Sequence, residues 1–147
     1  MEAIIFCGIQ ATGKTTFYVE HFMNSHVRIS MDLLHTRNKE RIFLDTCLQT
    51  HQRFVVDNTN PTRQDRERYI SPAREAKYRV IGYYFKSDPE EAVERNSRRE
   101  DNKQIPMAGI KGAAKKLEVP RLEEGFDELY HVSIQQGAFV VEAFPGG

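Results

Sequence analysis

Eight consecutive residues near the start of the sequence have the types and spacing of a phosphate-binding loop. They are Gly8-Ile9-Gln10-Ala11-Thr12-Gly13-Lys14-Thr15, a full match to the pattern G-x-x-x-x-G-K-[ST]. In such a loop backbone N–H groups turn toward a β- or γ-phosphate, the lysine adds a positive charge, and the hydroxyl after it binds Mg²⁺. The pattern predicts a site for a nucleoside triphosphate, with Lys14 at the phosphates, Thr15 at Mg²⁺ and Thr16 beside them.

A second polar segment is expected to face this loop. The apolar run at 53–57 ends in Asp57, and Asn58, Thr59 and Asn60 follow it. A strand that ends in aspartate has the form of a Walker B element, which holds Mg²⁺ directly or through water. Aspartate is also a common turn residue after a strand. Because ligands collect beyond the carboxyl ends of strands in open α/β sheets, the metal interpretation is favoured for Asp57.

Asp32 is the candidate general base. It follows the run 26–30 and precedes a polar segment of helical length. A kinase needs a carboxylate near the γ-phosphate to accept the proton of the attacking hydroxyl. Aspartate is also a favoured N-cap of a helix, and position alone does not separate the two interpretations.

Three arginines lie where a helix is expected to enter a polar loop. They are Arg95, Arg98 and Arg99, within the run 94–106. An arginine on a closing lid can neutralise the charge that develops on a transferred phosphoryl group. Cationic residues also stabilise the C-terminal end of any helix, so both roles stay open here.

Strand and helix patterns alternate along the chain and supply the frame for these residues. Apolar runs predict strands at 3–7, 26–30, 53–57, 78–85 and 137–141, and polar segments predict helices at 14–24, about 38–52, about 62–76 and 89–99. Ser71-Pro72 is expected to break the third of these helices. The alternation predicts an α/β three-layer fold, with a central parallel sheet covered on both faces.

Length and composition are those of one domain without a membrane span. The 147 residues suffice for one core, and no apolar run approaches the roughly 18 residues that a membrane helix needs. No secretory signal pattern is visible, so a cytoplasmic location is the default expectation. The net charge of zero, from 21 basic and 21 acidic residues, argues against nucleic-acid binding through the overall field and leaves a local basic groove open.

Taken together, these segments resemble the kinase domain of the P-loop 5′-hydroxyl polynucleotide kinases. Beyond the phosphate loop, the resemblance rests on residues 30–32, 56–61, 95–99, 105–106 and 117–126, and it covers nearly the whole chain. It implies a P-loop kinase fold over 1–147 with a small lid at about 95–110. The implied activity is Mg²⁺-dependent transfer of the γ-phosphate of ATP, or of another NTP, to 5′-hydroxyl ends of DNA or RNA.

The resemblance also implies roles for particular side chains. Lys14 and Thr15 would serve the phosphates and Mg²⁺, Asp32 would be the general base, Arg99 would stabilise the migrating phosphate, and Arg95 would assist at the nucleotide. The family often has Asn-Arg before the catalytic aspartate, where this chain has Ser30-Met31. Some members carry an arginine three residues after the aspartate, where this chain has His35, with Arg37 as a candidate substitute. The candidates for binding the acceptor are Asp32, His35, Arg37, Asp57, Thr59, Arg63 and Arg66.

Three functions are compatible with these residues. The first is a polynucleotide 5′-kinase, for which any ligase or phosphatase that repairs the same end would be a separate chain. The second is a small-molecule kinase that phosphorylates a nucleoside, sugar or antibiotic, and the neutral charge favours it. The third is a non-catalytic nucleotide-binding protein, which would require Asp32 to be only a helix cap. An open basic channel to Asp32 would select the first and a closed pocket the second.

Overall fold

A six-stranded sheet forms the centre of the molecule. The computed structural model describes residues 1–100 and 104–144, and its strand order is β2-β3-β1-β4-β5-β6. Strands β2, β3, β1, β4 and β5 run parallel, and β6 is antiparallel to β5. The strands are β1 (Glu2–Cys7), β2 (Val27–Ile29), β3 (Phe54–Val56), β4 (Arg79–Phe85), β5 (Glu128–Gln135) and β6 (Ala138–Ala143). The expected α/β fold is confirmed, with one antiparallel edge strand that makes the sheet mixed.

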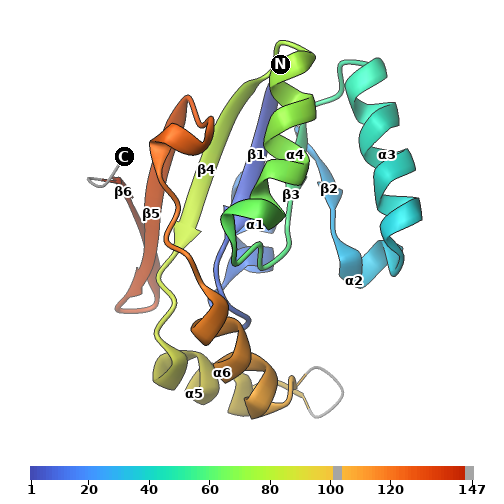
Figure 1. Ribbon diagram of the computed structural model, residues 1–147. Coiled ribbons are helices and arrows are strands. Elements are labelled where there is room, and N and C mark those ends of the chain that lie inside the picture. The colour runs from blue at the N-terminus through green and yellow to red at the C-terminus, as the bar shows by residue number, and fades with distance from the viewer. Residues whose placement is uncertain (101–103, 145–147) are drawn as a thin grey trace.

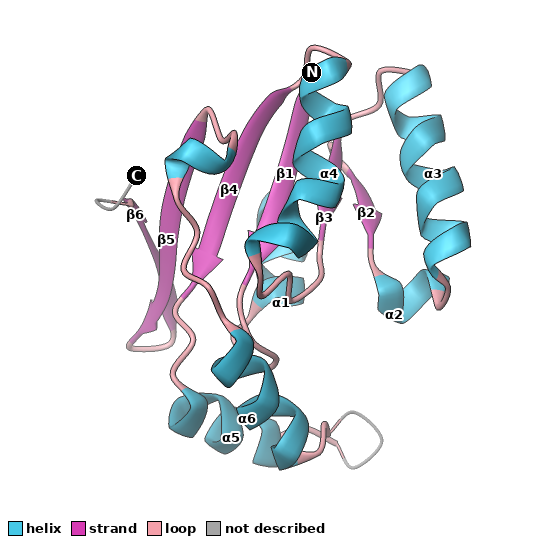
Figure 2. Ribbon diagram, viewed as in Figure 1, coloured by secondary structure: helices cyan, strands magenta, loops and turns pink. Residues whose placement is uncertain are grey.

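Helices cover both faces of this sheet, which gives three layers (Figures 1 and 2). The helices are α1 (Lys14–His21), α2 (Met31–Leu34), α3 (Arg37–Gln49), α4 (Arg63–Glu75), α5 (Pro89–Ser97) and α6 (Met107–Lys116), with a 3-10 turn, η2, at Leu122–Glu124. Successive strand residues point to opposite faces. In β1, Ile4 and Phe6 therefore pack with Phe17 of α1, whereas Ile5 packs with residues of α3 and α4 such as Leu44.

Helix α4 corrects one expectation from the sequence. It runs from Arg63 to Glu75 without a break and contains Pro72 in its interior. Thr62 and Asp65 form a capping box at its start, which satisfies two backbone N–H groups of the first turn. The core contacts of Tyr69 and Ala73, on either side of the proline, hold the helix together despite the lost hydrogen bond.

Three elements were not expected from the sequence. Helix α2 is a single short turn after β2, and helix α6 falls in a stretch without a clear periodic pattern. Strand β5 pairs in parallel with β4. Its residues Glu128, Tyr130 and His131 interrupt the apolar residues, so the segment shows no continuous apolar run. The strand expected at 137–141 exists as β6, at the edge of the sheet beside β5.

Helices α5 and α6, at the place of the expected lid and called the lid helices below, pack beyond the carboxyl ends of the strands (Figure 1). Ile9 and Ala11 of the phosphate loop are buried against Ala92 of α5 and Ile110 of α6. The buried Asn96 amide donates to the Ile105 carbonyl (2.6 Å) and accepts from its N–H (2.8 Å), which ties α5 to the segment before α6. Residues 101–103, inside the lid expected at 95–110, lie outside the described residues. No helix in the described part is long and apolar enough to cross a membrane.

Candidate active site

The phosphate loop connects β1 to α1, as its pattern predicts. Gly13 is the N-cap of α1, with a φ of 92°, and a Cβ atom there would come within 2.9 Å of the Phe139 ring. Both facts favour glycine at this position. From the other side the Thr59 carbonyl accepts from the Gly8 N–H (2.9 Å), and the Asn60 amide donates to the Phe6 carbonyl (2.8 Å). The segment after β3 therefore fixes the entrance to the loop.

Lys14 is buried inside its own loop. Its Nζ atom donates to the carbonyls of Ile9 (2.6 Å) and Gly8 (3.0 Å). Burial lowers the pKa of Lys14 from 10.5 to about 8, against the opposing effect of the Asp57 charge. The charges of Asp32 and Arg99 also act on the ammonium. The lysine is thus a partly desolvated cation that a phosphate in the loop could bind in place of the carbonyls.

The structure separates the two interpretations of Asp32. Ser30 is the N-cap of α2, because its side chain accepts a hydrogen bond from the Asp32 N–H at 3.2 Å. The capping role therefore belongs to Ser30, and the interpretation of Asp32 as the cap is wrong. The Asp32 residue is exposed and lines a cavity that it shares with Lys14. A carboxylate in this place is available to a substrate hydroxyl.

Thr15 and Asp57, the two residues expected to bind Mg²⁺, are in contact. The Thr15 hydroxyl donates to Asp57 Oδ2 at 2.9 Å, and both residues line the same cavity as Lys14. One hydroxyl and one carboxylate fit Mg²⁺, which keeps several waters and takes its other ligands from nucleotide phosphates. Among the described residues no three His, Cys, Asp or Glu side chains gather into a metal site. The residues present fit a metal that arrives with a nucleotide.

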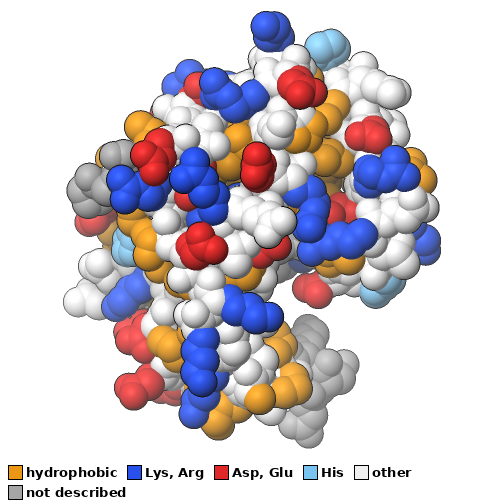
Figure 3. Space-filling view, in the orientation of Figure 1, with side chains coloured by type: hydrophobic (Ala, Val, Ile, Leu, Met, Phe, Trp, Pro, Cys, Tyr) orange, Lys and Arg blue, Asp and Glu red, His pale blue; other side chains and the backbone are white. Residues whose placement is uncertain are grey.

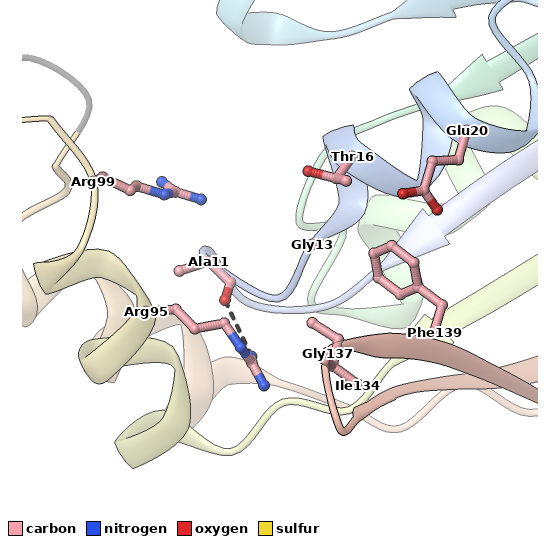
Figure 4. A pocket seen from close by; sticks show the side chains of 9 residues that line it. All are labelled: Ala11, Gly13, Thr16, Glu20, Arg95, Arg99, Ile134, Gly137 and Phe139. Carbon is pink, nitrogen blue, oxygen red and sulfur yellow. Dashed lines mark hydrogen bonds between the residues drawn. The ribbon is translucent and has the colours of Figure 1, made fainter.

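Two cavities meet at the phosphate loop. The larger has a volume of about 1030 Å³ and is lined by the loop, by Asp32 and by the segment after β3. The smaller has a volume of about 310 Å³ and lies between the loop, the lid and the β5–β6 hairpin (Figure 4). The space-filling view shows the molecule hollowed between the lid and the part that carries α2 and α3 (Figure 3). The arrangement offers one compartment on each side of the loop.

The three lid arginines divide between the cavities and solvent. Arg95 and Arg99 both line the smaller cavity, and Arg99 also lines the larger one. The Arg95 guanidinium donates to the carbonyl of Ala11 at 3.3 Å (Figure 4). Arg98 is exposed and pairs with Glu94 on the same helix. Arg95 lies in the last turn of α5 and Arg99 lies just beyond its end, yet both reach the smaller cavity, whereas Arg98, the C-cap, points to solvent.

The residues expected to bind the acceptor do not all meet at the cavity. Thr59 and Arg37 line the larger cavity, although Arg37 already donates to Glu40 (2.8 Å) and to the Tyr69 hydroxyl (3.0 Å). His35 and Arg63 are absent from the lining residues of either cavity. Arg63 instead lies 3.6 Å from Glu123.

The structure corrects the expectation that Arg66 binds the acceptor. Its side chain is 0% exposed, and it forms a two-point ion pair with Glu124 at 2.7 and 3.0 Å. It also donates to the Asn60 carbonyl at 2.9 Å. Arg66 therefore supports the loop entrance from inside the protein and is not available to an acceptor.

Sequence reasoning missed a buried network that supports the segment of Asp32. Asn58 accepts from the Met31 N–H (2.9 Å) and donates to Glu40 (3.0 Å) and to the Tyr69 hydroxyl (3.1 Å). The Tyr69 hydroxyl in turn donates to Glu40 at 2.9 Å. The one signal for this network was the polar Asn58 directly after Asp57. Its partners come from α3 and α4, which only the fold brings together.

Fold and loop together define a P-loop protein with the architecture of a kinase: a parallel sheet with one antiparallel edge strand, helices on both faces, and a lid over the phosphate loop. The chain belongs to the AAA domain family, whose model matches residues 4–120.

Comparison with known proteins supports this assignment. The chain is 27% identical over 135 residues to a Schizosaccharomyces pombe protein named bifunctional polynucleotide phosphatase/kinase. The match covers 89% of this chain and 33% of that protein, so the chain spans about a third of this relative's length. The similarity confirms the resemblance that the motifs indicated.

Solved structures of other proteins share the fold. A gluconokinase from Sinorhizobium meliloti 1021 has a TM-score of 0.65 at 17% identity, over 92% of this chain and 83% of that one. Kti12 from Chaetomium thermophilum, in complex with ADP-AlF3, also has a TM-score of 0.65, at 19% identity, over 89% of this chain and 88% of that one. At these identities the likeness shows the fold alone.

Proposed function

We propose that this chain is a kinase that transfers the γ-phosphate of ATP, or of another NTP, to the 5′-hydroxyl of a DNA or RNA end. The observation that carries the proposal is the carboxylate of Asp32 on the same cavity as Lys14, with the helix cap supplied by Ser30. The name of the S. pombe relative, a polynucleotide phosphatase/kinase, supports a polynucleotide as the acceptor.

Each candidate residue has a distinct role in the proposed transfer. The 5′-hydroxyl oxygen attacks the γ-phosphorus, its proton passes to the Asp32 carboxylate, and the bond from the γ-phosphorus to the β,γ-bridging oxygen breaks. The nucleoside diphosphate then leaves. Lys14 and Arg99 neutralise charge on the phosphoryl oxygens during transfer, and Arg95 orients the nucleotide. Thr15 and Asp57 would hold Mg²⁺, which supplies further positive charge at the phosphates when it is bound.

The lid arginines should differ in their effects on transfer. We expect Arg99→Ala to lower kcat strongly and Arg95→Ala to lower it less, because Arg99 lines both cavities and would meet charge that is largest in the transition state. Steady-state kinetics of the two variants measure this. Arg98→Ala is the matched control, since Arg98 faces solvent and should leave kcat near the wild-type value. A dominant loss at Arg98 would refute the assigned lid face.

The acceptor should be bound through few phosphates near its 5′ end. The net charge is zero, Arg66 is internal and Arg37 is engaged by Glu40, so the arginines expected to bind the acceptor do not form a long basic tract beside Asp32. We expect a trinucleotide with a free 5′-hydroxyl to be phosphorylated nearly as well as a long oligonucleotide, and a nucleoside poorly. The salt dependence should be shallow, with a slope of about −0.7 per phosphate contact on a single strand. Rates with labelled ATP and Mg²⁺ over this acceptor series test the proposal.

The engagement of Arg37 and Arg66 also favours a second candidate, a small-molecule kinase. The same acceptor series separates the two functions. Efficient phosphorylation of nucleosides or sugars, with no gain from a 3′-phosphate, would move the assignment to the second candidate.

A further inference from the structure

A guanidinium lies at the two residues that fit Mg²⁺. Arg28 Nε is 2.8 Å from Asp57 Oδ2, and Arg28 Nη2 is 3.3 Å from Thr15 Oγ1. The same Asp57 oxygen accepts from the Thr15 hydroxyl at 2.9 Å. Arg28 is in the middle of β2, and nothing in the phosphate-loop pattern requires an arginine there. One cation therefore already contacts both expected metal ligands.

Burial explains why Asp57 needs such a partner. Its side chain is only 3% exposed, and a carboxylate in that position is costly unless a cation or several donors compensate it. Arg28 supplies this compensation while remaining 18% exposed itself. Because β2 is one of the two edge strands of the sheet, the guanidinium has a route to solvent that a central strand would not give.

A divalent ion at Thr15 and Asp57 would compete directly with this arginine. Both cations need the same Asp57 oxygen, and their mutual repulsion is strong at contact distance in a partly buried site. A bound triphosphate changes the balance, because its negative charge attracts Mg²⁺ and provides the remaining oxygen ligands. Arg28 therefore opposes binding of the metal ion alone, whereas the metal ion together with a nucleotide binds Asp57 in preference to Arg28.

We propose that Arg28 occupies the magnesium site of the nucleotide-free protein, so that Mg²⁺ binds there tightly only together with a nucleotide. It neutralises Asp57 in the nucleotide-free protein and releases Asp57 and Thr15 when Mg²⁺ enters with the phosphates. Free Mg²⁺ then binds weakly, and metal and nucleotide bind with positive coupling, which by linkage is reciprocal. The proposal rests on the proposed function only in requiring a nucleotide in the loop, and it is independent of the acceptor.

Metal binding to the nucleotide-free protein tests the proposal. Mn²⁺ serves as the probe because it takes the same oxygen ligands as Mg²⁺, and its EPR signal reports the free ion. We expect Arg28→Met to bind Mn²⁺ at least about tenfold more tightly than the wild type, since the competing charge is gone. The coupling between Mn²⁺ and ATP should shrink by the same factor. Arg79→Met is the matched control, because Arg79 is also a strand arginine whose Nε contacts a carboxylate, Glu128 at 3.0 Å, away from the site.

A second variant separates charge from shape. Arg28→Lys keeps the positive charge beside Asp57 and should keep Mn²⁺ binding weak. Circular dichroism confirms that each variant is folded, and Mg²⁺ should raise the Tm of nucleotide-free Arg28→Met more than that of the wild type. Unchanged or weaker Mn²⁺ affinity in Arg28→Met, or equal tightening in Arg28→Lys, would overturn the proposal. Failure of phosphate transfer to oligonucleotides would leave these binding results intact, so the two proposals fail separately.

Discussion

Lys14→Ala is expected to abolish phosphate transfer, with a loss of about 10³-fold or more in kcat/KM, in the range for removing a preorganised charge at the transferred group. The Lys14 ammonium lies inside the loop against the carbonyls of Gly8 and Ile9. Its alanine variant leaves the phosphates without the one cation that the loop motif itself supplies. Single-turnover rates with labelled ATP measure the loss, and equilibrium dialysis measures the accompanying fall in ATP affinity.

The matching control is Lys39→Ala, which removes an exposed lysine from the first turn of α3. We expect that variant to keep both rate and affinity, since surface substitutions of this kind usually change stability by less than about 0.5 kcal/mol. Near wild-type turnover in Lys14→Ala would show that the loop is not the site of the phosphate donor.

The phosphate loop could be predicted from the sequence because its chemistry is local. Gly13, Lys14 and Thr15 are consecutive, and the strand and helix on either side have clear patterns. The central strands were equally visible, since buried parallel strands are short apolar runs. Strand β5 was not, because polar residues separate Leu129, Val132 and Ile134, so it contains no such run. The unbroken α4 shows core packing outweighing the penalty of Pro72.

The non-local part of the site could not be predicted from the sequence. Arg28 reaches Asp57 across 29 residues, and Arg66 reaches Glu124 across 58. No local pattern distinguishes these arginines from Arg63 or Arg74, which remain exposed. The roles of Arg28 and Arg66 depend on which side of a strand or helix faces the interior of the protein. The same limit applies to Asp32, because only the folded structure shows that Ser30, and not Asp32, caps α2.

The assignment of Asp32 as general base leads to the other large expected effect. Asp32→Asn should lower the rate of transfer by about 10²–10⁴-fold, the usual loss on removing a general base, while ATP affinity stays within a few fold. Asparagine keeps the shape of the side chain but cannot accept the proton. Rapid-quench kinetics with a 5′-hydroxyl oligonucleotide, together with ATP binding, measure the two quantities separately.

Stability measurements complete this test, because the cap and the base belong to different residues. Ser30→Ala removes the side chain that accepts from the Asp32 N–H, so it should cost about 0.5–2 kcal/mol of stability. Asp32→Asn should leave the free energy of unfolding nearly unchanged, as should Asp45→Asn, an exposed carboxylate on α3 that serves as the control for charge. If Asp32→Asn instead lost stability and kept its rate, Asp32 would be a structural residue, and the base would have to be sought among the other groups that line the larger cavity.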